Sequence, residues 1–193
     1  MSILVLTSDT LIGTPATGNI EYSGQFYGTD SNASRAQIQR ITQGTAVAST
    51  SGTSIDFTAL PSWVKRITVI LDTVSLSGTS QLLLQLGSGS IDTTSYTGSV
   101  SNHNGSAGTV FTTGFILTQS LVAAEFRAGL CTICLLGSNK WVESSLLQST
   151  TSTVGDRSAG VKTLGGTLDR LRITSVNGTD TFDAGSINIL YEG

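Results

Sequence analysis

Charged residues, proline, methionine, histidine and cysteine are all scarce in this sequence. Only 12% of the residues are charged, and the chain has two prolines, two cysteines, one methionine and one histidine. A helical bundle needs many Glu, Lys, Arg and Ala residues, and a disordered chain is rich in charge and poor in β-branched residues. The composition therefore argues against both of these classes.

The few charges are nearly balanced, with a formal net charge of −3. Proteins that bind nucleic acid carry clustered Lys and Arg, whereas the 10 basic residues are scattered here. No apolar run approaches the roughly 20 residues that span a bilayer. We therefore expect no nucleic-acid partner and no membrane insertion. The first residues also lack the pattern of a signal peptide, so we expect synthesis in the cytoplasm.

Small polar residues are abundant, because Gly, Ser and Thr make up about two residues in five. Thr, Val and Ile favour strands, and Gly, Ser and Asn favour the turns between them. About eight predicted strands is the number expected for a jelly-roll-like antiparallel β-sandwich. The predicted strands are Ser54–Phe57, Trp63–Leu76, Gln81–Leu86, Gly114–Leu121, Ala128–Leu136, Trp141–Leu147, Thr167–Val176 and Ala184–Tyr191. The sequence thus predicts an all-β domain over residues 44–193.

Residues 1–43 differ from the rest and predict an extended N-terminal arm. Asn19–Tyr27 alternates as a small hairpin would, and Ser34–Ile41 is the one segment with helical character. The arm has too few large apolar residues to fold alone, so we expect it to dock on another protein surface. Its candidate docking residues are Ile20, Tyr22, Phe26 and Tyr27.

Two stretches, 87–113 and 149–160, are nearly free of large apolar residues and predict long surface loops, which in compact domains are often functional. A simple decorated turn is the alternative. If these loops bind a ligand, Tyr96, His103 and Trp141 are the candidate surface-contact residues. Aromatic faces stack on sugar rings, while Ser, Thr and Asn form hydrogen bonds.

The two cysteines, Cys131 and Cys134, lie in an apolar run that predicts a buried strand. Residues i and i+3 of a strand point to opposite faces, so these thiols do not readily form a disulfide. A zinc site needs further ligands, which the lone His103 does not supply. We expect no metal and no cofactor.

Catalytic patterns are also missing from the sequence. Glycoside hydrolysis needs two carboxylates at a controlled separation, and no motif pairs the Asp and Glu residues here. A Ser-His-Asp triad needs an oriented base, and His103 lies in a Gly-, Asn- and Ser-rich segment. We therefore predict no catalytic residues and no enzymatic role.

Several blocks of sequence carry a likeness to known proteins. They are Gly52–Leu71, Gly78–Gly87, Gly166–Thr174 and Asn177–Glu192, with a weaker block at Ala16–Gly28. Together these blocks resemble the tailed-bacteriophage virion structural and tail-fibre β-sandwich family.

The resemblance implies a non-enzymatic component of a phage particle, and therefore localisation in the virion. Two roles stay open. The first is a tail-fibre or tail-tip protein that contacts the host surface, with a bacterial surface glycan as a candidate partner. The second is a capsid decoration (cement) or tail-adaptor protein whose N-terminal arm staples neighbouring subunits. The resemblance also implies a homotrimer and contacts with other virion proteins of the tail or capsid.

Overall fold

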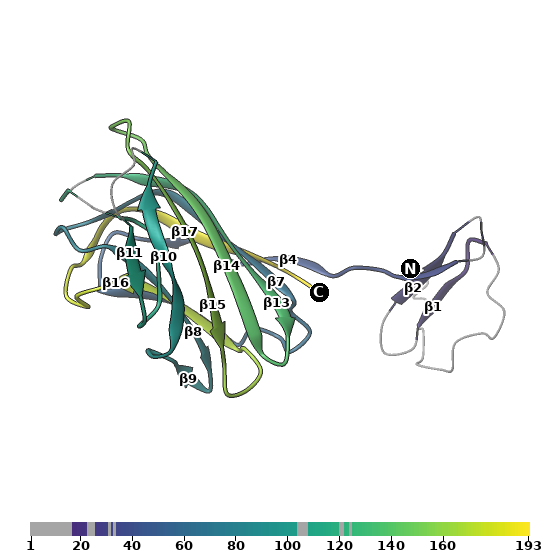
Figure 1. Ribbon diagram of the computed structural model, residues 1–193. Coiled ribbons are helices and arrows are strands. Elements are labelled where there is room, and N and C mark those ends of the chain that lie inside the picture. Colours follow the sequence, from purple (N-terminus) through teal and green to yellow (C-terminus); the bar gives the residue numbers. More distant parts are fainter. Residues whose placement is uncertain are drawn as a thin grey trace. The chain divides into compact units, whose positions relative to one another are not determined.

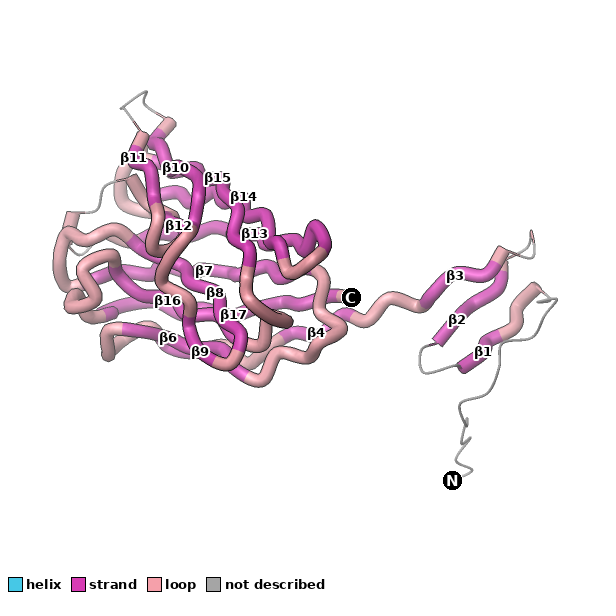
Figure 2. The backbone as a smooth tube through the Cα atoms, turned by 60° about the horizontal axis from the view of Figure 1, so that its bottom comes forward, coloured by secondary structure: helices cyan, strands magenta, loops and turns pink. Residues whose placement is uncertain are grey.

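The computed structural model describes residues 17–22, 26–30, 32, 34–103, 108–119, 122–123 and 125–193. Over these residues the protein is all-β, with antiparallel strands and no helix (Figure 2). The described residues accordingly include no helix with the length and hydropathy of a membrane span. The predicted all-β class is confirmed.

The chain divides into two compact units, Met1–Arg40 and Ile41–Gly193. In the first unit, three short strands form an antiparallel sheet in the order β1-β2-β3. Their bounds are β1 (Ile20–Tyr22), β2 (Phe26–Thr29) and β3 (Arg35–Gln37). The predicted hairpin is therefore present as β1 and β2, which pair from Ile20 with Gly28 to Tyr22 with Phe26.

The N-terminal segment differs from the prediction in two respects. The helix predicted over Ser34–Ile41 is wrong, because β3 occupies Arg35–Gln37 and extends the small sheet. The unit boundary also lies at residue 40 rather than 43, since β4 (Ile41–Gln43) pairs with the last strand of the second unit. Instead of an extended arm alone, the described residues before 41 contain a sheet of their own.

The second unit contains a large and a small antiparallel sheet (Figure 1). The large sheet runs in the order β11-β10-β15-β14-β13-β7-β17-β4, with β5 also paired to β17. Apart from β4, its strands are β5 (Val47–Ala48), β7 (Arg66–Leu76), β10 (Tyr96–Asn102), β11 (Thr109–Phe111), β13 (Arg127–Gly137), β14 (Lys140–Ser149), β15 (Gly155–Thr163) and β17 (Phe182–Glu192).

The small sheet has the order β12-β8-β16-β6, with β9 paired to β8. Its strands are β6 (Ser54–Thr58), β8 (Leu82–Ser88), β9 (Ser90–Ile91), β12 (Phe115–Ile116) and β16 (Arg170–Ser175). From β6 to β13 the main strands alternate between the two sheets, but β13, β14 and β15 follow one another as neighbours within the large sheet. A jelly roll in the strict sense therefore stays a prediction.

One apolar layer between the two sheets forms the core. Period-two alternation turns every second residue of a strand to the same face, and in β7 this buries Ile67, Val69 and Leu71. Leu84 of β8 and Ile173 of β16 face them from the small sheet and are fully buried. Each such side chain contributes about 1.5–3 kcal/mol on burial. On the opposite face of β7, Ile70 is only half-buried.

Both predicted long loops contain strands of the large sheet. Residues 87–113 include β10 and β11, and their Tyr96, Val100 and Phe111 are buried in the core. All of 155–160 belongs to β15, so the connection after β14 is much shorter than predicted. The loop predictions are therefore wrong at these strands, because strand neighbours bury segments whose own composition is small and polar.

The division into two units generates a prediction for truncation. A protein that begins at Ile41 should unfold cooperatively and keep its β-rich circular dichroism spectrum, because the core lies entirely within residues 41–193. Beginning instead at Thr45 removes β4 and the bond from the Gly44 amide to the Ile189 carbonyl (2.7 Å). That shorter chain should lose about 1–3 kcal/mol of unfolding free energy in urea titrations. An unfolded 41–193 protein would contradict the division.

Candidate functional site

Two of the three predicted surface-contact residues are buried in the core. Tyr96 is 1% exposed and Trp141 is 2% exposed. The Tyr96 ring packs edge-on against Phe115 at 4.9 Å between centroids, and its hydroxyl donates to the carbonyl of Asp92 at 2.9 Å. Burial raises the pKa of this hydroxyl. The prediction that Tyr96 and Trp141 contact a ligand at the surface is therefore wrong.

His103, the third candidate, is exposed just after β10. Its backbone amide donates to the Gly155 carbonyl at 3.0 Å, and its ring Nδ1 lies 3.0 Å from the same oxygen. Gly155 begins β15, so this contact joins the end of one strand to the start of its neighbour. A role for His103 in ligand contact stays a prediction.

The predicted docking residues divide between the two faces of the N-terminal sheet. Ile20, Tyr22 and Phe26 share one face through the β1–β2 register, while Tyr27 is paired with Glu21 on the other. Ile20 is 65% exposed and Phe26 is 44% exposed. The face with Tyr27 instead carries the ion pair between Glu21 and Arg35, 2.7 Å apart. One face of this unit is thus apolar and open, and the other is polar.

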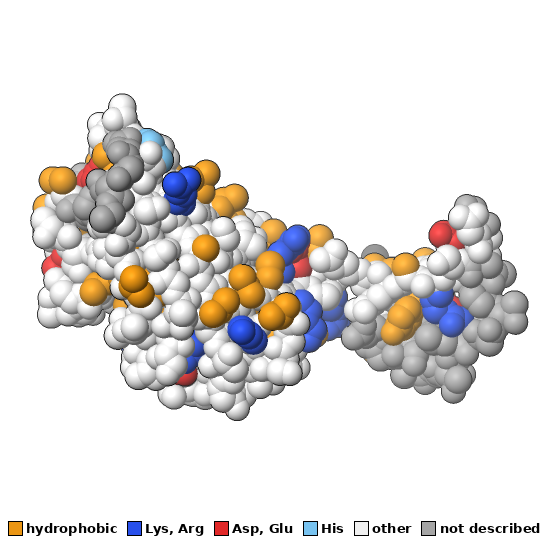
Figure 3. All heavy atoms as spheres, viewed as in Figure 1, with side chains coloured by type: hydrophobic (Ala, Val, Ile, Leu, Met, Phe, Trp, Pro, Cys, Tyr) orange, Lys and Arg blue, Asp and Glu red, His pale blue; other side chains and the backbone are white. Residues whose placement is uncertain are grey.

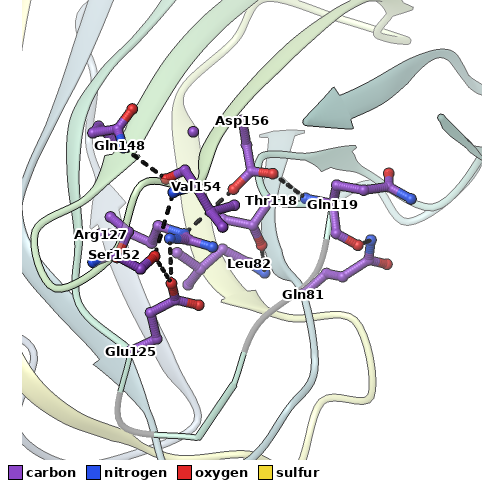
Figure 4. A network of polar contacts seen from close by, with 12 residues as sticks. Gln81, Leu82, Thr118, Gln119, Glu125, Arg127, Gln148, Ser152, Val154 and Asp156 are labelled. Carbon is purple, nitrogen blue, oxygen red and sulfur yellow. Dashed lines mark hydrogen bonds and ion pairs between the residues drawn. The ribbon is translucent and has the colours of Figure 1, made fainter. Parts of the chain in front are cut away.

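A buried ion network of Glu125, Arg127 and Asp156 lies at one end of the sandwich (Figure 4). Asp156 directly follows Gly155, the residue that His103 contacts. Arg127, the first residue of β13, is fully buried between two carboxylates. Its Nη1 donates to Glu125 at 2.9 Å, and its Nε lies 3.3 Å from Asp156, a charge contact without hydrogen-bond geometry. Asp156 accepts the Gln119 amide at 2.9 Å, and Glu125 accepts the Ser152 hydroxyl at 2.8 Å. The network therefore ties the connection before β13 to the one before β15.

A second buried acid, Glu143 of β14, lies within the layer between the sheets and is 1% exposed. Its Oε1 accepts the Ser158 hydroxyl at 2.7 Å and the Cys131 thiol at 3.4 Å. Its Oε2 has no hydrogen-bond partner within the described part of the chain. Burial is the main cause that raises the pKa of Glu143 to about 7, although these hydrogen bonds oppose it.

The opposite end of the sandwich carries a buried lysine and an open hollow. Lys162, near the end of β15, is 2% exposed, and its Nζ lies 2.6 Å from the Asp92 carboxylate. It also donates to the Thr94 carbonyl at 2.6 Å and lies 4.8 Å from the centre of the Tyr96 ring. Beside it, the segment around β9 and the connection after β15 enclose about 470 Å³. The lining residues are Ser88, Ser90, Ile91, Asp92, Thr93, Leu164, Gly165 and Gly166.

A second hollow of about 310 Å³ lies over the small sheet. Its larger polar side chains are bound to the protein. Arg172 donates to both oxygens of Asp56 at 2.7 Å, Gln85 donates to the Thr113 carbonyl, and Thr174 donates to the Thr53 carbonyl.

The outer face of the large sheet exposes a row of aliphatic side chains. Leu130 of β13 pairs in register with Leu146 of β14, and these side chains are 51% and 68% exposed. Leu136, at the end of β13, is 70% exposed. On the view in Figure 3, hydrophobic groups are interspersed with uncharged surface, and charged side chains are few. This sheet face therefore suits contact with protein better than contact with a charged polymer.

The cysteines lie as predicted, on opposite faces of β13. Cys131 is buried and Cys134 is exposed. Burial and the neighbouring Glu143 raise the pKa of the Cys131 thiol. Within the described ranges, no group of three or more His, Cys, Asp and Glu side chains is placed to hold a metal ion. No family model, curated protein or solved structure matches the chain.

The sequence did not predict three buried ionisable residues, namely Arg127, Glu143 and Lys162. Period-two alternation could have revealed Glu143, because it lies between Trp141 and Leu147 in a predicted strand and shares their face. Lys162 could not be found in this way, since β15 was largely predicted as a loop.

Breaking the buried ion network should cost far more stability than breaking an exposed pair. Arg127→Met leaves the Asp156 carboxylate buried without its cation, so urea unfolding should show a loss of about 3–5 kcal/mol. Arg172→Met is the matched control, because Arg172 and Asp56 are each 36% exposed. Its loss should be about 0.2–1 kcal/mol. Similar losses for the two variants would contradict a structural role for the network.

Glu143 should make the protein less stable as the pH rises. Its folded-state pKa of about 7 lies above the ordinary value of 4.5, so the folded state holds a proton that the unfolded state has released. The resulting stabilisation is fully present below pH 4.5 and is lost as the pH rises to 7. The loss is on the order of 3 kcal/mol. Thermal unfolding between pH 4.5 and 8 should show this decline in the wild type but much less in Glu143→Gln. Parallel pH profiles for the two proteins would contradict it.

Proposed function

We propose that this chain is a non-enzymatic structural protein of a tailed-bacteriophage particle, a tail-fibre or tail-tip component that contacts the host surface. The likeness of its sequence blocks to virion proteins suggests the class of particle. The observation that carries the proposal is the open apolar face of a unit separate from the sandwich, formed around Ile20, Tyr22 and Phe26. In this proposal the N-terminal unit docks on the particle and the sandwich carries the surface presented to the host.

The exposed row on the large sheet supports a second role. Leu130, Leu136 and Leu146 offer an aliphatic surface of the kind that packs against protein. Contact through this face with a capsid subunit would make the chain a decoration or tail-adaptor protein. Contact with further copies would give the expected homotrimer, which a monomer in light scattering at micromolar concentration would contradict.

A non-enzymatic role is also supported by where the unusual ionisable groups lie. Glu143 and Arg127 are buried and bonded within the fold, and neither lines the two hollows described above. A general acid or base must reach its substrate within hydrogen-bond distance. These side chains therefore act within the fold rather than on a substrate.

The two roles predict different binding partners for the purified full-length protein. A tail-fibre protein should bind host cells and not purified empty capsids, and a decoration protein should show the reverse. Ile20→Ser with Phe26→Ser should prevent incorporation into particles in either role, because it removes the apolar docking face. Gln37→Ser, an exposed position on the opposite face, is the control and should be incorporated normally. Binding to neither cells nor capsids would overturn both roles.

A further inference from the structure

We infer that the hollow beside β9 is a binding site for a neutral, polyhydroxylated ligand, namely a sugar residue of a surface glycan. The inference deepens the proposed host-contact function and rests on it for the source of the sugar. The hollow's volume of about 470 Å³ lies within the range of small-molecule sites, roughly 300–1,000 Å³. Its lining residues come from the segment around β9 and the connection after β15, at the end of β15 opposite Asp156 and the Arg127 network. Figure 1 labels both strands.

The polar groups of this hollow are available to a ligand. Within the described residues, the hydroxyls of Ser88, Ser90 and Thr93 make no hydrogen bond to protein. Each hydroxyl can donate one hydrogen bond and accept two. The hollow over the small sheet also carries guanidinium and amide groups, and these are bound to neighbouring protein atoms. In the hollow beside β9 the hydroxyls match a ligand that is itself rich in hydroxyl groups.

Asp92 supplies a fixed acceptor in the same wall. Its Oδ2 contacts Lys162 Nζ at 2.6 Å, and its Oδ1 accepts the Thr94 amide at 3.0 Å. Because Lys162 is held over the Tyr96 ring, the carboxylate it contacts is held as well. The side chain of Asp92 still remains 32% exposed. A carboxylate has about four acceptor positions, so this one can still accept a hydroxyl from a ligand.

Charge balance points to a neutral ligand. Asp92 is paired with Lys162, and nearby Asp169 is paired with Arg170 at 2.8 Å. Partial burial tends to raise the pKa of Asp92, but hydrogen bonds from Lys162 and Thr94 outweigh it, so the carboxylate stays ionised and its charge is offset by the lysine. A site with balanced charges gives no electrostatic preference for an anion or a cation. Hydroxyl groups are then the partners that the lining can recognise.

Gly165 lines the hollow and leaves space there because it has no side chain. A Cβ atom built on Gly165 meets no atom within 4 Å, so the space in front of this residue is open. The buried side chain of Leu164 and the half-buried side chain of Ile91 add apolar surface to the same hollow. A sugar ring presents hydroxyls on its rim and C–H groups on its faces, which matches this combination.

Filling the hollow provides a direct test in the full-length protein. The probes are glucose, galactose, rhamnose and N-acetylglucosamine, followed by amide chemical shifts in ¹H–¹⁵N spectra. At least one of them should shift the amides of Thr93 and Gly165. Gly165→Leu should weaken that binding at least tenfold, since Gly165 lines the hollow and a Cβ atom there meets no protein atom within 4 Å. Ser144→Leu places the same side chain on the exposed face of β14 and should bind the sugar normally.

A second variant removes hydrogen bonds without filling space. Ser90→Ala with Thr93→Val should weaken binding by about two- to tenfold for each hydroxyl lost, and neither hydroxyl bonds to the described protein. The inference is overturned if no neutral sugar shifts these amides, if the shifts lie elsewhere, or if galacturonate or glucosamine binds more tightly than every neutral sugar.

Cell binding separates this inference from the proposed function. If the wild type and Gly165→Leu bind host cells equally well, the sugar site is wrong and host contact stands. If a sugar binds in the hollow but the wild type binds no host cells, the site stands and the proposed host contact is wrong.

Discussion

The apolar layer between the two sheets is the interaction around which the rest of the sandwich is arranged. Strand alternation places Leu, Ile and Val from both sheets in this layer, and close packing excludes water from it. A polar group can enter such a layer only with bonding partners. Arg127 and Lys162 satisfy this condition at opposite ends of the sandwich. Arg127 is held by Glu125 and by Asp156 of β15, and Lys162 is held by Asp92. The need to pair these two buried cations therefore fixes the segment with Glu125 at one end of the sandwich and the segment with Asp92 at the other.

The two ends meet this requirement in different ways. At one end, Arg127 draws Glu125 and Asp156 together and leaves His103 outside on the rim. At the other, Lys162 holds the Asp92 segment against Tyr96, but the hydroxyls of the same segment stay open to a hollow. Glu143 is the exception, because it lies in the layer with one oxygen lacking a protein partner in the described structure. The fold therefore combines an end filled by the Arg127 network, an end with the hollow beside β9, and one buried carboxyl group, Glu143.

Strongly apolar strands were predictable from sequence, and weakly apolar ones were not. Segments such as Ser54–Phe57 and Ala184–Tyr191 correspond to β6 and β17 because their own residues supply the core. Strands β10 and β15 were missed, since Gly, Ser and Thr separate their few large side chains and their burial depends on neighbouring strands.

The dependence of burial on neighbouring strands also explains the errors in the candidate site. Tyr96 was placed on a surface loop because no local pattern distinguished a core tyrosine from an exposed one. Asp92 and Lys162 are 70 positions apart in sequence, and only the pairing of β10 with β15 brings them together. By contrast, the opposite orientation of Cys131 and Cys134 follows from strand geometry alone, and the structure confirms it.

The large sheet ends in very short strands. On one side lies β11 with three residues, and on the other lie β4 with three and β5 with two. A long exposed edge offers unpaired backbone groups to a neighbouring molecule and promotes fusion of sheets between molecules. Edges this short offer only a few such groups. Copies crowded side by side at high local concentration can therefore touch through side chains while each sheet stays separate.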